Sequence, residues 1–171
     1  GIPEAISAAM CSFPTLEGAI DTVILTIQSG IPVARMELLD DVQMAACMAY
    51  SKLDYAPGHT ILFEFHGTEN GVREQVELTQ AITQEHGGLE FEWANRPEDR
   101  TKLWQARHDA HYANIAARPG MRGWVTDVCV PISRLAECIA ETSADIAQSK
   151  LFAPIVGHVG DGNFHVDFML D

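Results

Sequence analysis

The chain has 171 residues, of which 47% are hydrophobic and 8% aromatic, so it can bury one core and is expected to form a single domain over 1–171. Its formal net charge is −13, from 11 Lys and Arg against 24 Asp and Glu, which argues against nucleic acid and anionic membrane surfaces as partners because both would repel it. A small anionic substrate would therefore need locally placed cations. No run of about 18 apolar residues is present to span a bilayer, and the N-terminus lacks the pattern of a signal peptide.

Hydrophobic alternation and helix caps predict strands and helices in turn along the chain. The predicted strands cover 5–13, 33–39, 60–67, 89–93, 123–130, 154–156 and 164–170. The predicted helices run from 15 to the stop at Gly30, from a cap at Asp40 to 50, from 71 to 85, from 97 to 118, and onward from Ser133. At least four strands alternate clearly, which favours a largely antiparallel sheet with helices on one face over a doubly wound parallel sheet. We therefore expect an α+β fold built from ferredoxin-like or split βαβ units.

The four cysteines lie in apolar surroundings without a C-x-x-C pair, and they are Cys11, Cys47, Cys129 and Cys138. This pattern favours buried free thiols in a reducing compartment over a disulfide framework. The predicted strand 33–39 places Arg35 and Glu37 on one face, where the two side chains could form an ion pair.

The predicted helix 97–118 carries unusual chemistry, because Leu103, Arg107 and His111 recur on one face at helical spacing. A guanidinium on an otherwise apolar face can offer two parallel donors to the two oxygens of a small carboxylate. The alternative is a surface ion pair between this arginine and Asp109 or Glu98.

The segment 154–170 is predicted to be a hairpin with Asp161-Gly162 as its two-residue turn. This register would place His158 directly opposite His165, with Cβ atoms roughly 5 Å apart on one face. Two imidazoles so close can bind one divalent metal and leave coordination positions open for a substrate. The alternative is a hairpin that carries two surface histidines.

Three sequence blocks follow one another along the chain: Leu103-Trp104-Gln105-Ala106-Arg107-His108-Asp109-Ala110, Thr126-Asp127-Val128-Cys129-Val130-Pro131-Ile132-Ser133-Arg134-Leu135, and His158-Val159-Gly160-Asp161-Gly162-Asn163-Phe164-His165. In this order they resemble the flavin-linked D-2-hydroxyacid dehydrogenases, and they are most similar to the D-lactate dehydrogenase and glycolate oxidase branch. Together with the segment 32–40, the likeness covers essentially the whole chain. In such proteins this region is the C-terminal substrate domain, and an N-terminal domain of the vanillyl-alcohol-oxidase type holds the FAD.

The resemblance also implies roles for individual residues. It makes His158 and His165 ligands of a divalent metal, such as Zn, Mn or Fe, and makes Arg107 the cation that holds the substrate carboxylate. It places His111 at the substrate and Asn163 near the flavin or substrate. Val125 falls where the hydroxyglutarate enzymes have a lysine, which argues against dicarboxylate substrates.

The resemblance further implies partners and a location. The expected partners are a small 2-hydroxyacid, an N-terminal FAD domain of the same chain, an electron acceptor (cytochrome, quinone or flavoprotein) and a second copy in a homodimer. The expected location is the cytoplasm, with a peripheral place at the inner membrane as an alternative, and the mitochondrion in a eukaryote. Family members carry an acid-His-Gly segment after the hairpin, so residues 1–171 alone are expected to be inactive.

Two other functions remain open from the residues alone. One is a metal-dependent hydrolase that uses His158, His165 and an acid such as Asp161 or Asp167. The other is a non-catalytic module for small-molecule binding or dimerisation.

Overall fold

The computed structural model describes all residues from 1 to 171. The strands are β1 (Ala5–Phe13), β2 (Arg35–Leu39), β3 (His59–Gly67), β4 (Leu89–Ala94), β5 (Arg122–Val125), β6 (Val128–Cys129), β7 (Ile155–Gly157) and β8 (Asn163–Leu170). The helices are α1 (Leu16–Gln28), α2 (Asp41–Ser51), α3 (Glu69–Glu85), α4 (Pro97–Ala117) and α5 (Ile132–Ser149). None of these helices combines the length and the apolar character that crossing a bilayer requires.

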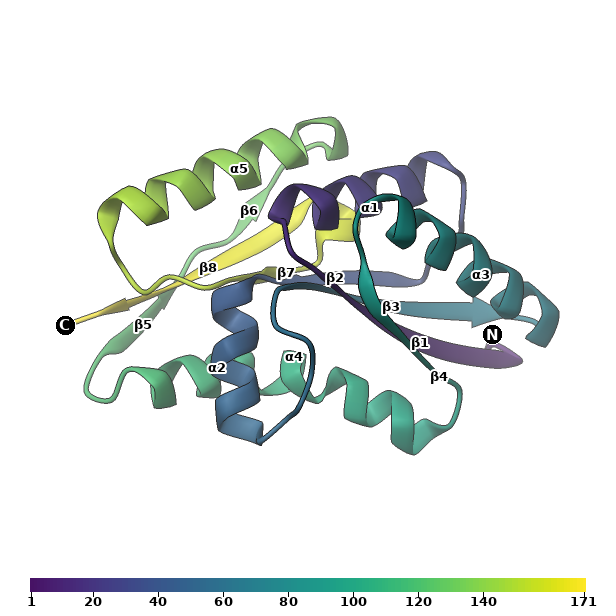
Figure 1. The fold of residues 1–171 in the computed structure, drawn as a ribbon, viewed down its shortest axis with the longest axis horizontal. Helices are drawn as coiled ribbons and strands as arrows, with labels where there is room; N and C mark the ends of the chain where they lie inside the picture. The colour runs from purple at the N-terminus through teal and green to yellow at the C-terminus, as the bar shows by residue number, and fades with distance from the viewer.

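The strands form one sheet in the order β4-β1-β3-β2-β7-β8-β5, and β6 pairs with β8 beside this path (Figure 1). Every strand pairing is antiparallel. The first four strands with α1 and α3 make a ferredoxin-like unit, because each split βαβ pair has one antiparallel strand inserted between its two strands. The predicted α+β class and its antiparallel sheet are confirmed.

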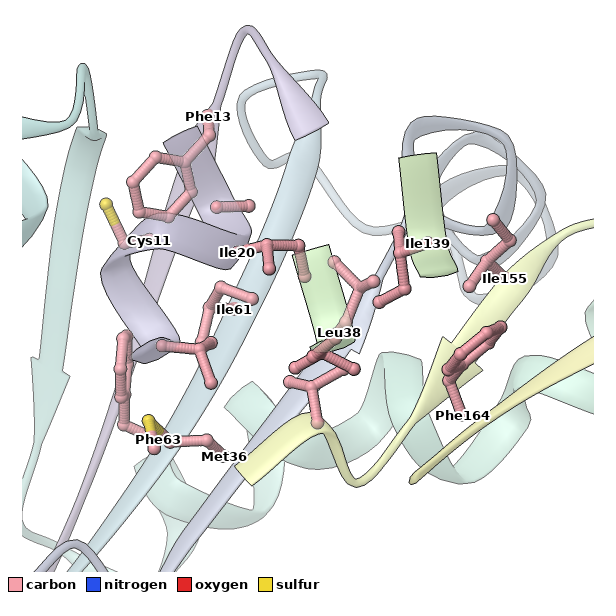
Figure 2. Packing of buried hydrophobic residues seen from close by; sticks show 14 of the residues in the cluster. Cys11, Phe13, Ile20, Met36, Leu38, Ile61, Phe63, Ile139, Ile155 and Phe164 are labelled. Atoms are coloured by element: carbon pink, nitrogen blue, oxygen red, sulfur yellow. The ribbon is translucent and has the colours of Figure 1, made fainter. Parts of the chain in front are cut away.

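The helices cover both faces of the sheet, which corrects the expectation that they pack on one face. Figure 1 places α1, α3 and α5 on one side and α2 and α4 on the other. Two separate cores result, one of 20 buried residues under the three helices (Figure 2) and one of 14 under the other two. The strand β1, which lies between β4 and β3, is buried on both faces, with Phe13 in the first core and Met10 in the second, so a cover on one side alone would leave apolar surface in water.

The cap of α2 lies as the sequence predicts. The Asp40 carboxylate accepts a hydrogen bond of 2.8 Å from the backbone N–H of Gln43, which is an N-cap contact. Asp40 directly follows β2 and is buried, and this burial raises the pKa of its carboxyl to about 7.

The predicted strand 123–130 is two short strands instead of one. β5 and β6 both pair with β8, and Thr126 and Asp127 lie between them. The cysteines are all free, as expected, but they differ in burial. Cys11 and Cys47 are buried as predicted, whereas Cys138 is only partly buried and Cys129 on β6 is exposed, which corrects the prediction for these two residues.

Candidate functional site

The connection between β7 and β8 is longer than the predicted two-residue turn. In the observed register, His165 lies opposite Val156. His158 instead begins a loop with one 3-10 turn (Val159–Asp161), and its carbonyl accepts from the N–H groups of Asp161 (3.0 Å) and Asn163 (3.2 Å). The prediction that His158 and His165 face each other across the hairpin is therefore wrong. Gly162 does adopt positive φ (75°), but it closes the 3-10 turn instead of forming a two-residue hairpin turn.

Glu37 on β2 contacts two of the predicted site residues. Its Oε2 accepts from Arg107 Nε at 2.6 Å, and its Oε1 lies 2.6 Å from His158 Nδ1. The Glu37 side chain is only 1% exposed. The structure thus joins α4, β2 and the residue after β7 at one carboxylate. The alternative partners of Arg107 are excluded, because Asp109 accepts from Ser51 and Gln105 and Glu98 makes no ion pair with it.

The guanidinium of Arg107 keeps one edge available. Glu37 binds the Nε–H, whereas neither terminal nitrogen has a hydrogen-bond partner in the protein, and the side chain is 26% exposed. Two terminal N–H groups in one plane are the donors that a small carboxylate accepts in parallel.

The expected ion pair between Arg35 and Glu37 is present but long. Arg35 Nε lies 3.9 Å from Glu37 Oε1, and a second nitrogen lies 3.9 Å from Glu64 on β3. The Arg35 guanidinium stacks on the Trp104 ring, with Cζ 3.6 Å from the ring centroid. The shorter contacts of Glu37 are thus those to Arg107 and His158.

His165 and Asn163 are fixed by the segment between β5 and β6. The His165 ring nitrogen Nδ1 lies 2.9 Å from the carbonyl oxygen of Thr126, and 3.5 Å from Asp127 Oδ1. The Asn163 amide donates to Asp127 Oδ1 (2.7 Å) and to the carbonyl of Val128 (3.0 Å). The interruption of the predicted strand therefore holds two predicted site residues.

The partners of His158 and His165 define which ring nitrogen carries the proton. A carbonyl and a carboxylate can only accept, so Nδ1 of each ring faces an acceptor, and in a neutral imidazole this leaves the lone pair on Nε2. Histidines that bind a metal typically make this second contact to a carboxylate or backbone carbonyl. No group of three His, Cys, Asp or Glu side chains in the chain gathers around one point where a metal ion could sit. The chain therefore offers two suitable nitrogens and not a complete ligand set.

His111, which is also on α4, contacts a second cluster of buried polar side chains. Its Nδ1 lies 3.1 Å from Oδ2 of Asp167, a buried acid on β8 that also accepts from Asn114 at 2.8 Å. Asn114 in turn exchanges two hydrogen bonds with Gln43, of 2.9 and 3.0 Å. Asp167 Oδ1 is buried and has no partner. The imidazole of His111 is half exposed, so its other nitrogen can meet a ligand.

Sequence reasoning paired Glu37 with Arg35 but missed its shorter contacts to Arg107 and His158, and it missed the role of Asp167 as an anchor for a histidine. The signal for both is the same. Each acid stands inside an apolar strand, Glu37 between Met36 and Leu38 and Asp167 between Val166 and Phe168. A buried carboxylate requires paired donors, so such an acid predicts cations or N–H groups on the element that covers it.

Comparison with known proteins gives a consistent result. The family described as FAD linked oxidases, C-terminal domain, matches residues 2–171. A protein of Danio rerio named probable D-lactate dehydrogenase, mitochondrial, is 49% identical over 171 residues, covering 100% of this chain and 34% of that protein. D-lactate dehydrogenase [cytochrome], mitochondrial, of Arabidopsis thaliana is 42% identical over 170 residues, covering 99% of this chain and 30% of that protein.

Among solved structures, alkyldihydroxyacetonephosphate synthase superimposes with a TM-score of 0.71 at 13% identity, covering 100% of this chain and 37% of that one. This likeness concerns the fold alone. The chain spans about a third of the length of the two curated relatives.

Proposed function

Because the chain belongs to the family of C-terminal domains of FAD-linked oxidases, we propose that residues 1–171 are the substrate-binding domain of an FAD-dependent dehydrogenase. The enzyme would oxidise a small D-2-hydroxyacid, with D-lactate as the first candidate, to the 2-oxoacid. The family match confirms the resemblance that the three sequence blocks predicted. The names of the zebrafish and Arabidopsis relatives support D-lactate. The complete activity is proposed for the full-length protein, in which an N-terminal domain of the same chain holds the FAD.

The observation that carries this proposal is the free edge of the Arg107 guanidinium, held in place by the buried Glu37. Its terminal N–H groups would bind the substrate carboxylate and so fix the carbon that bears the hydroxyl. FAD, when bound, supplies the acceptor for the hydride. The contribution of this chain is then binding and orientation, and it explains how a protein of net charge −13 can take an anion.

His158 and His165 are proposed to hold the divalent metal, Zn, Mn or Fe, through their Nε2 atoms. Nδ1 of each ring faces an acceptor, which supports the neutral tautomer whose Nε2 can bind a metal. At least one further ligand is needed beyond these two. A metal there would lower the pKa of the substrate hydroxyl.

Three further side chains are proposed to shape the substrate site. His111, anchored by Asp167, would contact the substrate through its exposed nitrogen. Asn163 would lie near the flavin or the substrate. Val125 on β5 is 49% exposed and uncharged, which supports a monocarboxylate because no cation stands there for a second carboxylate.

The names of the relatives and the exposed apolar residues also indicate partners and a location. A cytochrome is favoured over a quinone or a flavoprotein as electron acceptor by the name of the Arabidopsis relative, and a mitochondrial location is favoured over the cytoplasm by both names. Trp124 and Val125 leave apolar surface exposed on the edge strand β5, which supports contact with the FAD domain or with a second copy in a homodimer.

The test uses the full-length protein, with D-lactate-dependent reduction of a dye and metal content measured together. We expect the wild type to be active and His165→Ala to lose both metal and activity. His66→Ala is the matched control, because His66 is an exposed histidine on β3 that pairs only with Glu64. It should leave both quantities unchanged.

The outcomes separate the parts of the proposal. A wild type that oxidises no D-2-hydroxyacid would overturn the proposed function. An active wild type whose His165→Ala variant keeps metal and activity would refute the metal site alone.

A further inference from the structure

Glu37 is buried at a place where the fold requires no charge. It lies opposite Leu62 on β3, and its neighbours on β2, Met36 and Leu38, face the larger core. The side chain projects to the other face, beneath α4, and is 1% exposed. Removing a carboxylate from water in this way is unfavourable unless strong donors surround it.

The two oxygens of Glu37 are divided between two predicted site residues. Oε2 accepts from Arg107 Nε at 2.6 Å and Oε1 lies 2.6 Å from His158 Nδ1, whereas Arg35 is more distant at 3.9 Å. A single buried carboxylate therefore contacts both the side chain proposed to bind the substrate carboxylate and an imidazole proposed to hold the metal next to the substrate hydroxyl. The carboxylate and the hydroxyl of a 2-hydroxyacid are attached to the same carbon, so the two protein groups that meet them need a fixed spacing.

We propose that Glu37 is a positioning residue, which holds Arg107 and His158 as one unit for a small 2-hydroxyacid. This inference rests on the proposed function and deepens it. Glu37 accepts the hydrogen bond of the Arg107 Nε–H, so the two terminal nitrogens of the guanidinium stay available for a ligand. It also keeps the proton of His158 on Nδ1, which leaves the lone pair of Nε2 free. Glu37 acts through these two residues and does not itself touch the substrate.

The substitution Glu37→Gln separates this role from simple packing, since glutamine has nearly the same shape. Its single carbonyl oxygen can accept from Arg107 or from His158 but not from both, and its amide N–H₂ would then face a donor. At least one of the two residues loses its anchor. The loss of one hydrogen bond to a charged group corresponds to roughly a 10- to 100-fold lower affinity for the ligand.

The experiment uses the full-length protein and two readouts. Binding of pyruvate, the product carboxylate, is measured by calorimetry without turnover, and KM and kcat for D-lactate are measured separately. We expect Glu37→Gln to weaken pyruvate binding and to raise KM by about 10- to 100-fold. In a double-mutant cycle, adding Glu37→Gln to Arg107→Lys should cause much less loss of pyruvate binding than Glu37→Gln causes in the wild type, because both changes remove the same anchored guanidinium and only the contact to His158 is left to lose.

Glu64→Gln is the matched control for the same chemical change. Glu64 lies on the neighbouring strand β3, is 26% exposed and pairs with His66 and Arg35, but it contacts neither Arg107 nor His158. It should leave pyruvate binding and KM unchanged. Glu37→Asp provides a second variant. It keeps a negative charge beside Arg107, but its side chain is one methylene shorter and should not reach both Arg107 and His158.

The result that overturns the inference is a folded Glu37→Gln or Glu37→Asp protein that binds pyruvate within about twofold of the wild type. Losses that add fully in the double-mutant cycle would overturn it as well. Pyruvate binding tests Glu37, whereas turnover by the wild type tests the proposed function, so the two can fail independently.

Discussion

Asp40→Asn should make the protein more stable, and increasingly so as the pH rises. Asp40 caps α2 and is 6% exposed. Burial raises the pKa of its carboxyl from 3.8 to about 7, against the opposing hydrogen bond from Gln43, and the charge of Asp41 adds to the rise. Asparagine offers the same side-chain oxygen to the cap and carries no charge, so the substitution removes the buried charge and keeps the hydrogen bond.

The sign and size of the effect follow from proton linkage. Between the unfolded value of 3.8 and the folded value of about 7, the folded state of this group binds more protons than the unfolded state. Its contribution to the free energy of unfolding therefore falls as the pH rises through that window. From these two values, the wild type should lose about 2.5 kcal/mol relative to Asp40→Asn between pH 5 and pH 8.

The assay is urea unfolding of the wild type and Asp40→Asn at pH 5 and at pH 8. All other titrating groups are common to the two proteins, so their contributions cancel in the difference. Asp41→Asn is the control, because the Asp41 side chain is 57% exposed. It should give a much smaller pH-dependent change. A stability difference between wild type and Asp40→Asn that is the same at both pH values would refute the argument.

Three further predictions concern the backbone, substrate choice and thiol reactivity. Gly162→Ala should lower the urea midpoint much more than Gly30→Ala, because both glycines have positive φ (75° and 71°) but only Gly162 lies against a neighbouring backbone carbonyl; equal shifts would contradict this. Val125→Lys in the full-length protein should raise kcat/KM for D-2-hydroxyglutarate relative to D-lactate by about tenfold or more, and an unchanged ratio would remove Val125 from the substrate site. Cys129, which is exposed, should react with iodoacetamide well before Cys47, whose burial raises its thiol pKa to about 11. Mass spectrometry of the labelled protein gives the order of reaction, and earlier labelling of Cys47 would contradict the prediction.

Local signals in the sequence predicted the elements well. The strand 5–13 matches β1, the helices end within a few residues of their predicted limits, and the capping pair of Asp40 with Gln43 is present. These features depend on residues close together in the chain, such as a side-chain acceptor three residues before an N–H. The ferredoxin-like order of the first four strands followed from the alternation of the elements.

The register of the hairpin was not predictable from its turn residues alone. Asp161-Gly162 is favoured in two-residue turns, but a glycine at positive φ equally well ends a 3-10 turn, and the structure uses it for that purpose. A change in loop length alters which residues face each other, so His165 lies opposite Val156 instead of His158. The choice of loop depends on packing between distant segments, which the sequence of the turn does not encode.

The orientation of α4 shows why the partners of the site residues escaped prediction. The side of α4 that faces the sheet is partly polar: Arg107, His111 and Asn114 follow one another at helical spacing and contact two buried acids. Glu37 on β2 lies 70 residues from Arg107 in sequence, and Asp167 on β8 lies 56 from His111.

Hydrophobic periodicity alone would predict that these polar residues of α4 face water. The acids supply the missing signal, since a carboxylate inside an apolar strand needs donors from the element that covers it. Pairing the polar positions of a covering helix with buried acids on the strands would therefore have predicted both the orientation of α4 and the contact between Glu37 and Arg107.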